Sequence, residues 1–393
     1  MTYTLEHTEA EGKKFVKFEN PSKTEVQICS KCLMLASRPR LTFDEKGVCA
    51  ACRWAEEKKT TVDWKARKLE LEQFCNKYRS SSGFDVIVPV SGGKDSSTVA
   101  HKLKYEWNMN PLCINVNHYV DVNTEMNETN IKNFVKNGFE VLRLYPNQKI
   151  ERDIDRIGLI EYGQPYFGWM TSMVLAPVKI ALQFNIPFIM YGEEGEVEYG
   201  GSQKLKNTPV YTIEDTVKFY LSGVHPKTYL NKYSEKDLYW WLPPSEEQVK
   251  KLNPAVCHWS YFENWDSNYN YEYAKKYAGL QSQKNNSSGT YNNFAQTDGI
   301  LYPLHTYFMY LKFGFGRCSQ DVCIDIRSGK ITREAGIELI NKYDAVYPEQ
   351  FEEQYLDYYK LSKEEFYAVI DKFANKDLLE KKNGRWVKKF KLV

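Results

Sequence analysis

The sequence has almost no net charge and no long apolar run. Lysine and arginine number 53 against 51 aspartate and glutamate residues, a formal net charge of +2. A nucleic-acid enzyme usually carries a broad basic surplus, so this balance disfavours an RNA substrate. No apolar stretch approaches the roughly 20 residues that a membrane-spanning helix needs, and residues 1–7 lack the basic and apolar regions of a signal peptide. We therefore expect a cytoplasmic protein with no membrane partner.

The sequence also lacks the even cysteine pattern of an oxidised disulfide framework. Instead, four cysteines form two Cys-x-x-Cys pairs, and two such pairs complete a tetrahedral sulfur site. Four protein ligands leave no coordination position open on the metal, which indicates a structural Zn²⁺ that stabilises the fold of a short segment. An iron–sulfur cluster and four unbound thiols are the alternatives. The expected metal ligands are Cys29, Cys32, Cys49 and Cys52.

A glycine-rich motif follows the apolar run at residues 84–90, where residues 91–97 read Ser-Gly-Gly-Lys-Asp-Ser-Ser. The glycines let successive backbone N–H groups point at an anion, and the helix that begins here adds the positive end of its dipole. The loop is too short to be a Walker-type phosphate loop, and a plain Gly-Gly turn is the alternative. The motif resembles the PP-loop of ATP pyrophosphatases, which split ATP into AMP and pyrophosphate. This resemblance implies ATP contacts from Ser91, Gly92, Gly93, Lys94, Asp95, Ser96 and Ser97, to which we add Asn117.

Apolar segments alternate with helical segments from residue 84 to residue 191. This alternation indicates an α/β fold with a doubly wound parallel sheet. Ligands bind beyond the carboxyl ends of such strands, which places residues 91–97, Asn117-His118 and residues 192–194 around one crevice. The expected parts are a leader (1–25), a zinc knuckle (26–56), a linker helix (57–80), the ATP-binding domain (84–199), an aromatic-rich insert (200–299), a segment completing the catalytic domain (300–345) and a C-terminal helical and hairpin region (346–393).

The insert at residues 200–299 mixes tryptophan and tyrosine with Asn, Ser and Gly. Aromatic faces beside hydrogen-bonding side chains suit a sugar ring, so we expect a substrate cap. An all-helical unit that uses the aromatics as core is the alternative. Three arginines after the insert are able to clamp a carboxylate or phosphate, although each is commonly a surface ion pair. The residues expected to bind substrate are Glu198, Tyr199, Arg317, Asp321, Arg327 and Arg333.

Several of these motifs together resemble the N-acetyl sugar amidotransferase family over residues 26–345. They are the knuckle, the loop at residues 91–96, and the segments 191–201, 312–317, 325–327 and 332–335. The resemblance implies a role in bacterial surface polysaccharide, lipopolysaccharide or nonulosonic acid synthesis. The implied reaction converts the acetamido group of a nucleotide-linked or acidic N-acetyl sugar to an acetamidino group. The family also implies a separate glutaminase, paired as in the glutaminase and cyclase subunits of histidine biosynthesis.

The residues fit this chemistry. Adenylation of the amide oxygen gives an imidate with AMP as leaving group, which ammonia displaces. We expect Lys94 to neutralise charge on the departing pyrophosphate. Asp95 is expected to hold Mg²⁺, with capping of the next helix as the alternative. Glu193 is expected to contact the metal or deprotonate ammonium, and Glu194 and Glu198 are further candidates.

No cysteine of the sequence has the setting expected of a glutaminase nucleophile. It has no cysteine before Cys29, and Cys257-His258 are neighbours in sequence, which does not generate a nucleophile–base geometry. The alternative function is a PP-loop tRNA thiolase or lysidine-type ligase. Such enzymes normally show a basic face or a catalytic Cys-x-x-Cys in the nucleotide domain, but no cysteine lies between Cys113 and Cys257. A non-catalytic module is the least expected, because it would not need the Lys94-Asp95 pair.

Overall fold

The computed structural model describes residues 26–192, 196–201, 203–212, 221, 226–295 and 297–392. Its centre is a six-stranded sheet in the order β3-β2-β1-β4-β6-β5. Five strands pair in parallel, and the short β5 pairs antiparallel to β6 at one edge. This confirms the predicted doubly wound parallel α/β fold. The strands are β1 (Val86–Pro89), β2 (Pro111–Val116), β3 (Glu140–Leu144), β4 (Phe188–Tyr191), β5 (Val210–Tyr211) and β6 (Ala255–His258).

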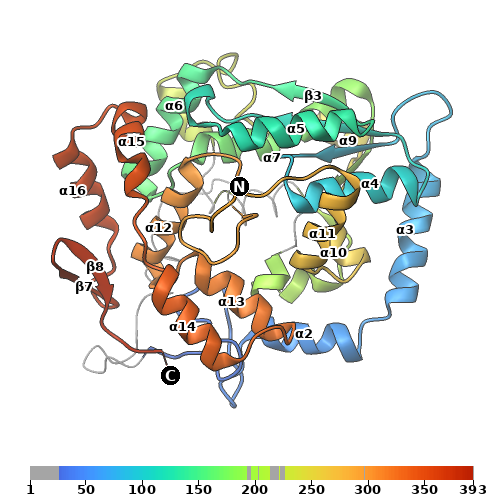
Figure 1. Cartoon of the computed structure of the whole chain (residues 1–393). Coiled ribbons are helices and arrows are strands. Elements are labelled where there is room, and N and C mark those ends of the chain that lie inside the picture. Colours follow the sequence, from blue (N-terminus) through green and yellow to red (C-terminus); the bar gives the residue numbers. More distant parts are fainter. Residues whose placement is uncertain are drawn as a thin grey trace.

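Every residue of β1, β2, β4 and β6 is buried, as expected for a parallel sheet covered on both faces. Alternate residues of β1 face two different cores: Ile87 belongs to one cluster, and Val86 and Val88 to the other. Figure 1 shows the helices around the sheet. They are α4 (Lys94–Tyr105), α5 (Glu125–Lys136), α6 (Gln148–Ile157), α7 (Phe167–Phe184), α9 (Glu246–Leu252), α10 (Trp259–Phe262), α11 (Ser267–Tyr277), α12 (Leu301–Phe313), α13 (Arg317–Arg327) and α14 (Arg333–Tyr343).

Helix α7 is the one helix among the described residues with the length and apolarity of a membrane span. However, 72% of its apolar window is buried inside the protein. Its residues Ala176 and Ile180 belong to the same core cluster as Ile87 of β1. Helix α7 is therefore packed as the core helix of an α/β domain.

The aromatic-rich insert, residues 200–299, contributes β5 and β6 to the central sheet. The apolar residues of β6 pair with β4, from Phe188 opposite Ala255 to Tyr191 opposite His258. Two of the insert's tryptophans are core residues: Trp241 is fully buried and Trp259 is 2% exposed. For these two side chains the core interpretation holds, because they pack on α7 and β6 rather than face solvent.

The expected linker helix over residues 57–80 is two helices, α2 (Ala50–Thr60) and α3 (Trp64–Tyr78). Asp63 separates them, since its carboxylate accepts hydrogen bonds from the backbone N–H groups of Lys65 and Ala66, both at 3.0 Å. The leader, residues 1–25, lies outside the described residues.

The C-terminal region contains the predicted helix and hairpin. Ser362 and Glu365 form the capping box at the start of α16 (Lys363–Phe373). Asn383 and Gly384, both with positive φ, join β7 (Leu379–Lys382) to β8 (Arg385–Lys388) in the manner of a type I′ turn. Helix α15 (Glu352–Tyr359) precedes α16 and packs against α6, and Figure 1 shows α15, α16 and the hairpin together at the left of the molecule.

Candidate functional site

The glycine-rich motif forms the turn from β1 into α4 at the carboxyl edge of the sheet. Gly92 has φ +79°, a conformation that favours glycine, and Gly93 is the N-cap of α4. Gly192, directly after β4, passes so close that a Cβ there would lie 2.6 Å from the backbone nitrogen of Ser96. The buried Ser96 hydroxyl has no hydrogen-bond partner within the described parts of the chain. The loop is thus compact and presents an unpaired donor where an anion is expected.

Asp95 is held by side chains of the insert. Its Oδ1 accepts hydrogen bonds from Trp265 Nε1 at 2.9 Å and Asn270 Nδ2 at 2.8 Å. Its Oδ2 pairs with the ammonium group of Lys94, which also lies over the Trp265 ring at 5.6 Å. The structure therefore brings the expected residues Lys94 and Asp95 together and fixes them from a segment about 170 residues away in sequence.

Asn117 follows β2 and is oriented by Arg143 of β3. The Arg143 guanidinium donates to Asn117 Oδ1 at 2.9 Å and to Asn115 Oδ1 at 3.1 Å. Two further hydrogen bonds, at 2.8 and 2.7 Å, join it to the Glu128 carboxylate and lower the pKa of that group. The Nδ2 group of Asn117 is buried without a partner among the described residues. An unpaired buried donor costs free energy unless a ligand satisfies it, so Asn117 is presented to the crevice.

Asp298 also lies at this edge, and no sequence motif marked it. The segment around it runs along residues 122–124, with Ile300 N donating to Val122 O at 2.9 Å and Thr124 N to Asp298 O at 3.3 Å. The half-buried carboxylate lies close enough to the Ser91 hydroxyl and to Lys94 of the loop for both groups to lower its pKa. Burial raises the pKa of Asp298 to about 6, against the opposing effects of Ser91 and Lys94.

His118, next to Asn117, is 2% exposed and stacks on Trp169 with a ring separation of 3.8 Å. Burial lowers its pKa to about 3, so the imidazole is neutral. Neither ring nitrogen has a partner in the described parts of the chain. Tyr166 packs edge-on against Trp169 at 5.5 Å and against His305 at 4.5 Å. These rings form an aromatic wall at the carboxyl end of β2, where Trp169 Nε1 donates to Val116 O at 2.9 Å.

The residues expected to bind substrate divide into two groups. Arg317 lies near the aromatic wall, where its charge opposes the rise in the pKa of Tyr166 that burial causes. Its Nε pairs with Asp321 Oδ1 at 2.9 Å. The other oxygen of Asp321 accepts from Thr290 at 2.6 Å and Asn292 at 2.7 Å. Arg317 and Asp321 thus occupy a polar cluster with Thr290 and Asn292.

Arg327 and Arg333 instead contact the cysteine knuckle. Arg327 donates to Cys32 Sγ at 3.7 Å and to the backbone oxygen of Glu198 at 3.2 Å, and Arg333 donates to Cys29 O at 2.8 Å. The thiolate charge on the knuckle raises the pKa of Arg327, although burial opposes this. These contacts are structural ones, to the knuckle and to the segment after β4.

Glu198 and Tyr199 lie in the short helix η3 (Glu196–Tyr199) beside the knuckle. The Glu198 carboxylate accepts from Trp54 Nε1 at 2.9 Å and from Lys58 at 2.7 Å, both on α2. The Tyr199 ring carries the guanidinium of Arg38 at 4.7 Å. Glu193 and Glu194 lie outside the described residues.

The four knuckle cysteines converge on one point. Their sulfur atoms lie within 4.8 Å of one another, with 3.8 Å between those of Cys29 and Cys52 and 3.6 Å between those of Cys32 and Cys49. Zinc–sulfur bonds of about 2.3 Å in a tetrahedron place sulfurs about 3.8 Å apart. The donor set therefore fits a single tetrahedral metal ion. The Cys323 thiol of α13 donates to Cys32 O at 2.6 Å and joins the knuckle to the C-terminal helices.

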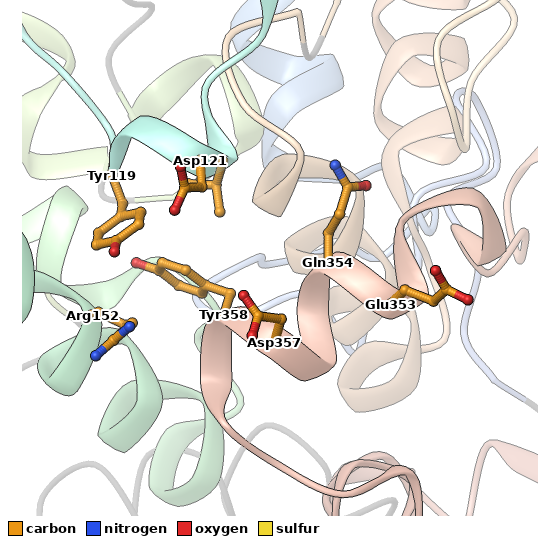
Figure 2. Close-up of a pocket in the computed structure, with 8 residues that line it drawn as sticks. Tyr119, Asp121, Arg152, Glu353, Gln354, Asp357 and Tyr358 are labelled. Atoms are coloured by element: carbon orange, nitrogen blue, oxygen red, sulfur yellow. The ribbon is translucent and has the colours of Figure 1, made fainter.

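A separate pocket of about 240 Å³ lies between α6, α15 and the short helix η1 (Val120–Val122), and none of the loop residues lines it. Figure 2 shows the Tyr119 and Tyr358 rings in this pocket, with Asp121 and Arg152 near them; the two rings pack edge to face, with 5.2 Å between their centroids. The Tyr358 hydroxyl donates to Asp155 Oδ2 at 2.7 Å. Tyr358 thus connects the pocket to the buried acids of α6.

A serine- and glycine-rich loop between the first strand and helix, at the carboxyl edge of a doubly wound parallel sheet, defines a PP-loop-type α/β fold. Residues 288–392 match the family model of the C-terminal domain of WbpG-like LPS biosynthesis proteins. This match supports the resemblance to N-acetyl sugar amidotransferases, and it fits a sugar-modifying enzyme. The matched range contains Asp298, Arg317 and Asp321.

No curated protein matches the chain. Among solved structures, the chain is similar to a U34-tRNA thiolase, NcsA from Methanococcus maripaludis with its [4Fe-4S] cluster, at 12% identity. The alignment covers 78% of this chain and 87% of that chain, with a TM-score of 0.30. A score this low carries no argument about activity.

Proposed function

We propose that the chain is an ATP-dependent, AMP-forming N-acetyl sugar amidotransferase. It converts the acetamido group of a nucleotide-linked or acidic N-acetyl sugar to an acetamidino group through an adenylated imidate. The observation that carries the proposal is the juxtaposition of the PP-loop with the WbpG-like segment, since Asp298 of the segment lies close enough to Ser91 and Lys94 of the loop for both to lower its pKa. ATP chemistry and the sugar-associated domain thereby share one crevice.

In this reaction the amide oxygen of the acetamido group attacks the α-phosphorus of ATP, and pyrophosphate leaves. Ammonia then adds to the imidate carbon, a proton is lost, and AMP departs with the former amide oxygen. Lys94, which pairs with Asp95 at the start of α4, is the residue proposed to neutralise charge on the pyrophosphate, and the unpaired donors of Ser96 and Asn117 support an anion site here. Mg²⁺ supplies charge neutralisation when bound, and Asp95 is the expected ligand. Glu193 remains the proposed residue for deprotonating ammonium.

We propose that the sugar binds between this loop and the aromatic wall, with Arg317 and Asp321 beside it. Arg327, Arg333, Glu198 and Tyr199 then act on the substrate indirectly, through the knuckle and η3. Zn²⁺ is the proposed knuckle metal, because the sulfur separations fit one ion, whereas a [4Fe–4S] cluster binds each cysteine to a different iron and spreads the sulfurs apart.

The proposed nitrogen source is ammonia from a separate glutaminase of the histidine-biosynthesis type. Burial raises the pKa of the Cys257 thiol, which lies inside β6, so it is not an activated nucleophile. Cys318 and Cys323 are buried too, and their thiols donate to backbone oxygens.

The test is a mass-spectrometric assay with ATP, ammonium and a panel of nucleotide-linked N-acetyl sugars, run beside bulk tRNA. We expect AMP, pyrophosphate and a sugar product one mass unit lighter, because NH replaces O. Lys94→Ala should abolish all three products. ADP and phosphate as the sole nucleotide products would refute a PP-loop reaction, and turnover with tRNA alone would favour the thiolase or ligase alternative.

A further inference from the structure

We propose that Asp298, contributed by the C-terminal segment, is a second carboxylate ligand of the Mg²⁺ that accompanies ATP. This inference rests on the proposed function and adds a residue to the same site. About 200 residues separate Asp298 from the phosphate loop in sequence, and the fold brings the two close together.

The backbone fixes Asp298 at the carboxyl edge of the sheet. Residues 297–300 lie along the segment after β2, through the bonds of Ile300 N to Val122 O and Thr124 N to Asp298 O and the bridge between Asn123 and Gly299. The Thr124 hydroxyl also bonds Thr297 O. Main-chain bonds on both sides of residue 298 therefore hold it at this edge without help from a ligand, within electrostatic reach of Lys94.

The groups around the Asp298 carboxylate are those of an anion-binding loop. Thr297 Oγ1 donates to its Oδ1 at 3.4 Å, and Ser91 and Lys94 of the loop are close enough to lower its pKa. Its one bonded partner among the described residues is a hydroxyl, which rotates easily and leaves carboxylate lone pairs available to a cation. Mg²⁺ is bound in such sites by one or two carboxylates together with phosphate oxygens.

The hydrogen bonds of Asp95 indicate that Mg²⁺ needs a second carboxylate ligand. Both of its oxygens are engaged by protein donors: Oδ1 by Trp265 and Asn270, and Oδ2 by Lys94. When Lys94 turns to the pyrophosphate, Oδ2 becomes available and Oδ1 stays held. Asp95 then offers a single oxygen, so Asp298 supplies the further negative charge that a divalent cation between loop and phosphates requires.

The test measures ATP binding by calorimetry with excess MgCl₂ and with EDTA, using the full chain and Asp298→Asn. We expect Asp298→Asn to lose about tenfold or more of the Mg²⁺-dependent part of the affinity, and to bind ATP in EDTA as well as or better than the wild type, because a negative charge near the phosphates is gone. Mn²⁺ paramagnetic resonance in the presence of ATP should show a matching loss of bound metal. Asp298→Glu should keep part of the Mg²⁺ dependence.

Asp371→Asn is the matched control. It removes a carboxylate in the same domain that bonds Trp386 at 2.8 Å and Lys381 at 2.7 Å, and it should leave both binding modes unchanged. Wild-type Mg²⁺ dependence in Asp298→Asn would overturn the inference while leaving the proposed function standing. Loss of ATP binding in EDTA as well would assign Asp298 to loop support and also overturn it. A wild-type chain that binds no ATP in either condition would instead refute the proposed function itself.

Discussion

The clamp on Asp95 gives a quantitative prediction. Asn270→Ala removes one of the two hydrogen bonds to Asp95 Oδ1, the one of 2.8 Å. A hydrogen bond to a charged group contributes about 1.5–3 kcal/mol, and the Asp95 side chain is 18% exposed, which places the effect in the lower half of that range. We expect a loss of about 2 kcal/mol in transition-state stabilisation, or about thirtyfold in kcat/KM for ATP.

Trp265→Phe should cost a similar factor, because it removes the other donor and keeps an aromatic ring over Lys94. In the double variant, the free-energy losses of the two single variants should not add, since both donors serve one oxygen. Asn268→Ala is the matched control: the same side chain lies two residues earlier on α11 and bonds Asp325 at 3.3 Å instead of Asp95.

The assay is continuous pyrophosphate release with ammonium and nucleotide-linked N-acetyl sugars, together with ATP calorimetry, which needs no acceptor. Thermal unfolding of each variant separates loss of the fold from loss of the clamp. Asn270→Ala with the same kcat/KM and ATP affinity as Asn268→Ala would refute the role of the clamp.

Three further predictions concern the metal, the buried acids and the nitrogen source. The purified protein should carry one zinc per chain by elemental analysis, and Cys49→Ser should lose it and unfold at a lower temperature, since metal binding supplies local folding energy; full zinc content in this variant would contradict the site. Burial raises the pKa of Asp155 to about 7 and raises that of Glu151 well above its usual range, so the folded state holds protons that the unfolded chain releases above about pH 4. Stability should therefore fall as the pH rises through 4 to about 7 and beyond, and Glu151→Gln should flatten this slope in denaturant titrations; an unchanged slope would argue against the buried pair. Free ammonia at alkaline pH should support turnover by this chain alone, whereas glutamine should not; glutamate release without a partner would require a hidden nucleophile, with Cys257→Ser the first variant to make.

The sequence was sufficient to predict the features that depend on local spacing. The phosphate loop, the parallel sheet, the two Cys-x-x-Cys pairs and the turn at Asn383-Gly384 each need only neighbouring residues and the periodicity around them. The four sulfur atoms converge as their spacing predicted. Burial of β1 and β2 on both faces likewise follows from their continuous apolar runs.

The polar contacts around the loop were beyond such reasoning, because each joins segments far apart in the chain. Asn270 reaches Asp95 across 175 residues and Arg143 reaches Asn117 across 26. Nothing in the local sequence of Asp298 distinguishes it from any other loop aspartate. Conversely, Arg327 and Arg333 have the chemistry of anion clamps, and only the packing of α13 and α14 on the knuckle reveals that they bond Cys32 and Cys29.

The C-terminal segment, residues 288–392, packs against the α/β unit and the cysteine knuckle. Helix α12 lies within the WbpG-like range, and its residues Leu304 and Phe308 belong to the same core cluster as Ile87 of β1. Residues 297–300 bond the segment after β2, and Cys323 of α13 bonds the knuckle. The WbpG-like segment therefore contributes to both the hydrophobic core and the carboxyl edge of the α/β unit. A chain ending before residue 288 would lack the α12 residues of this core and Asp298, so we expect the PP-loop unit and the C-terminal segment to fold as one unit rather than as an ATPase with an attached recognition module.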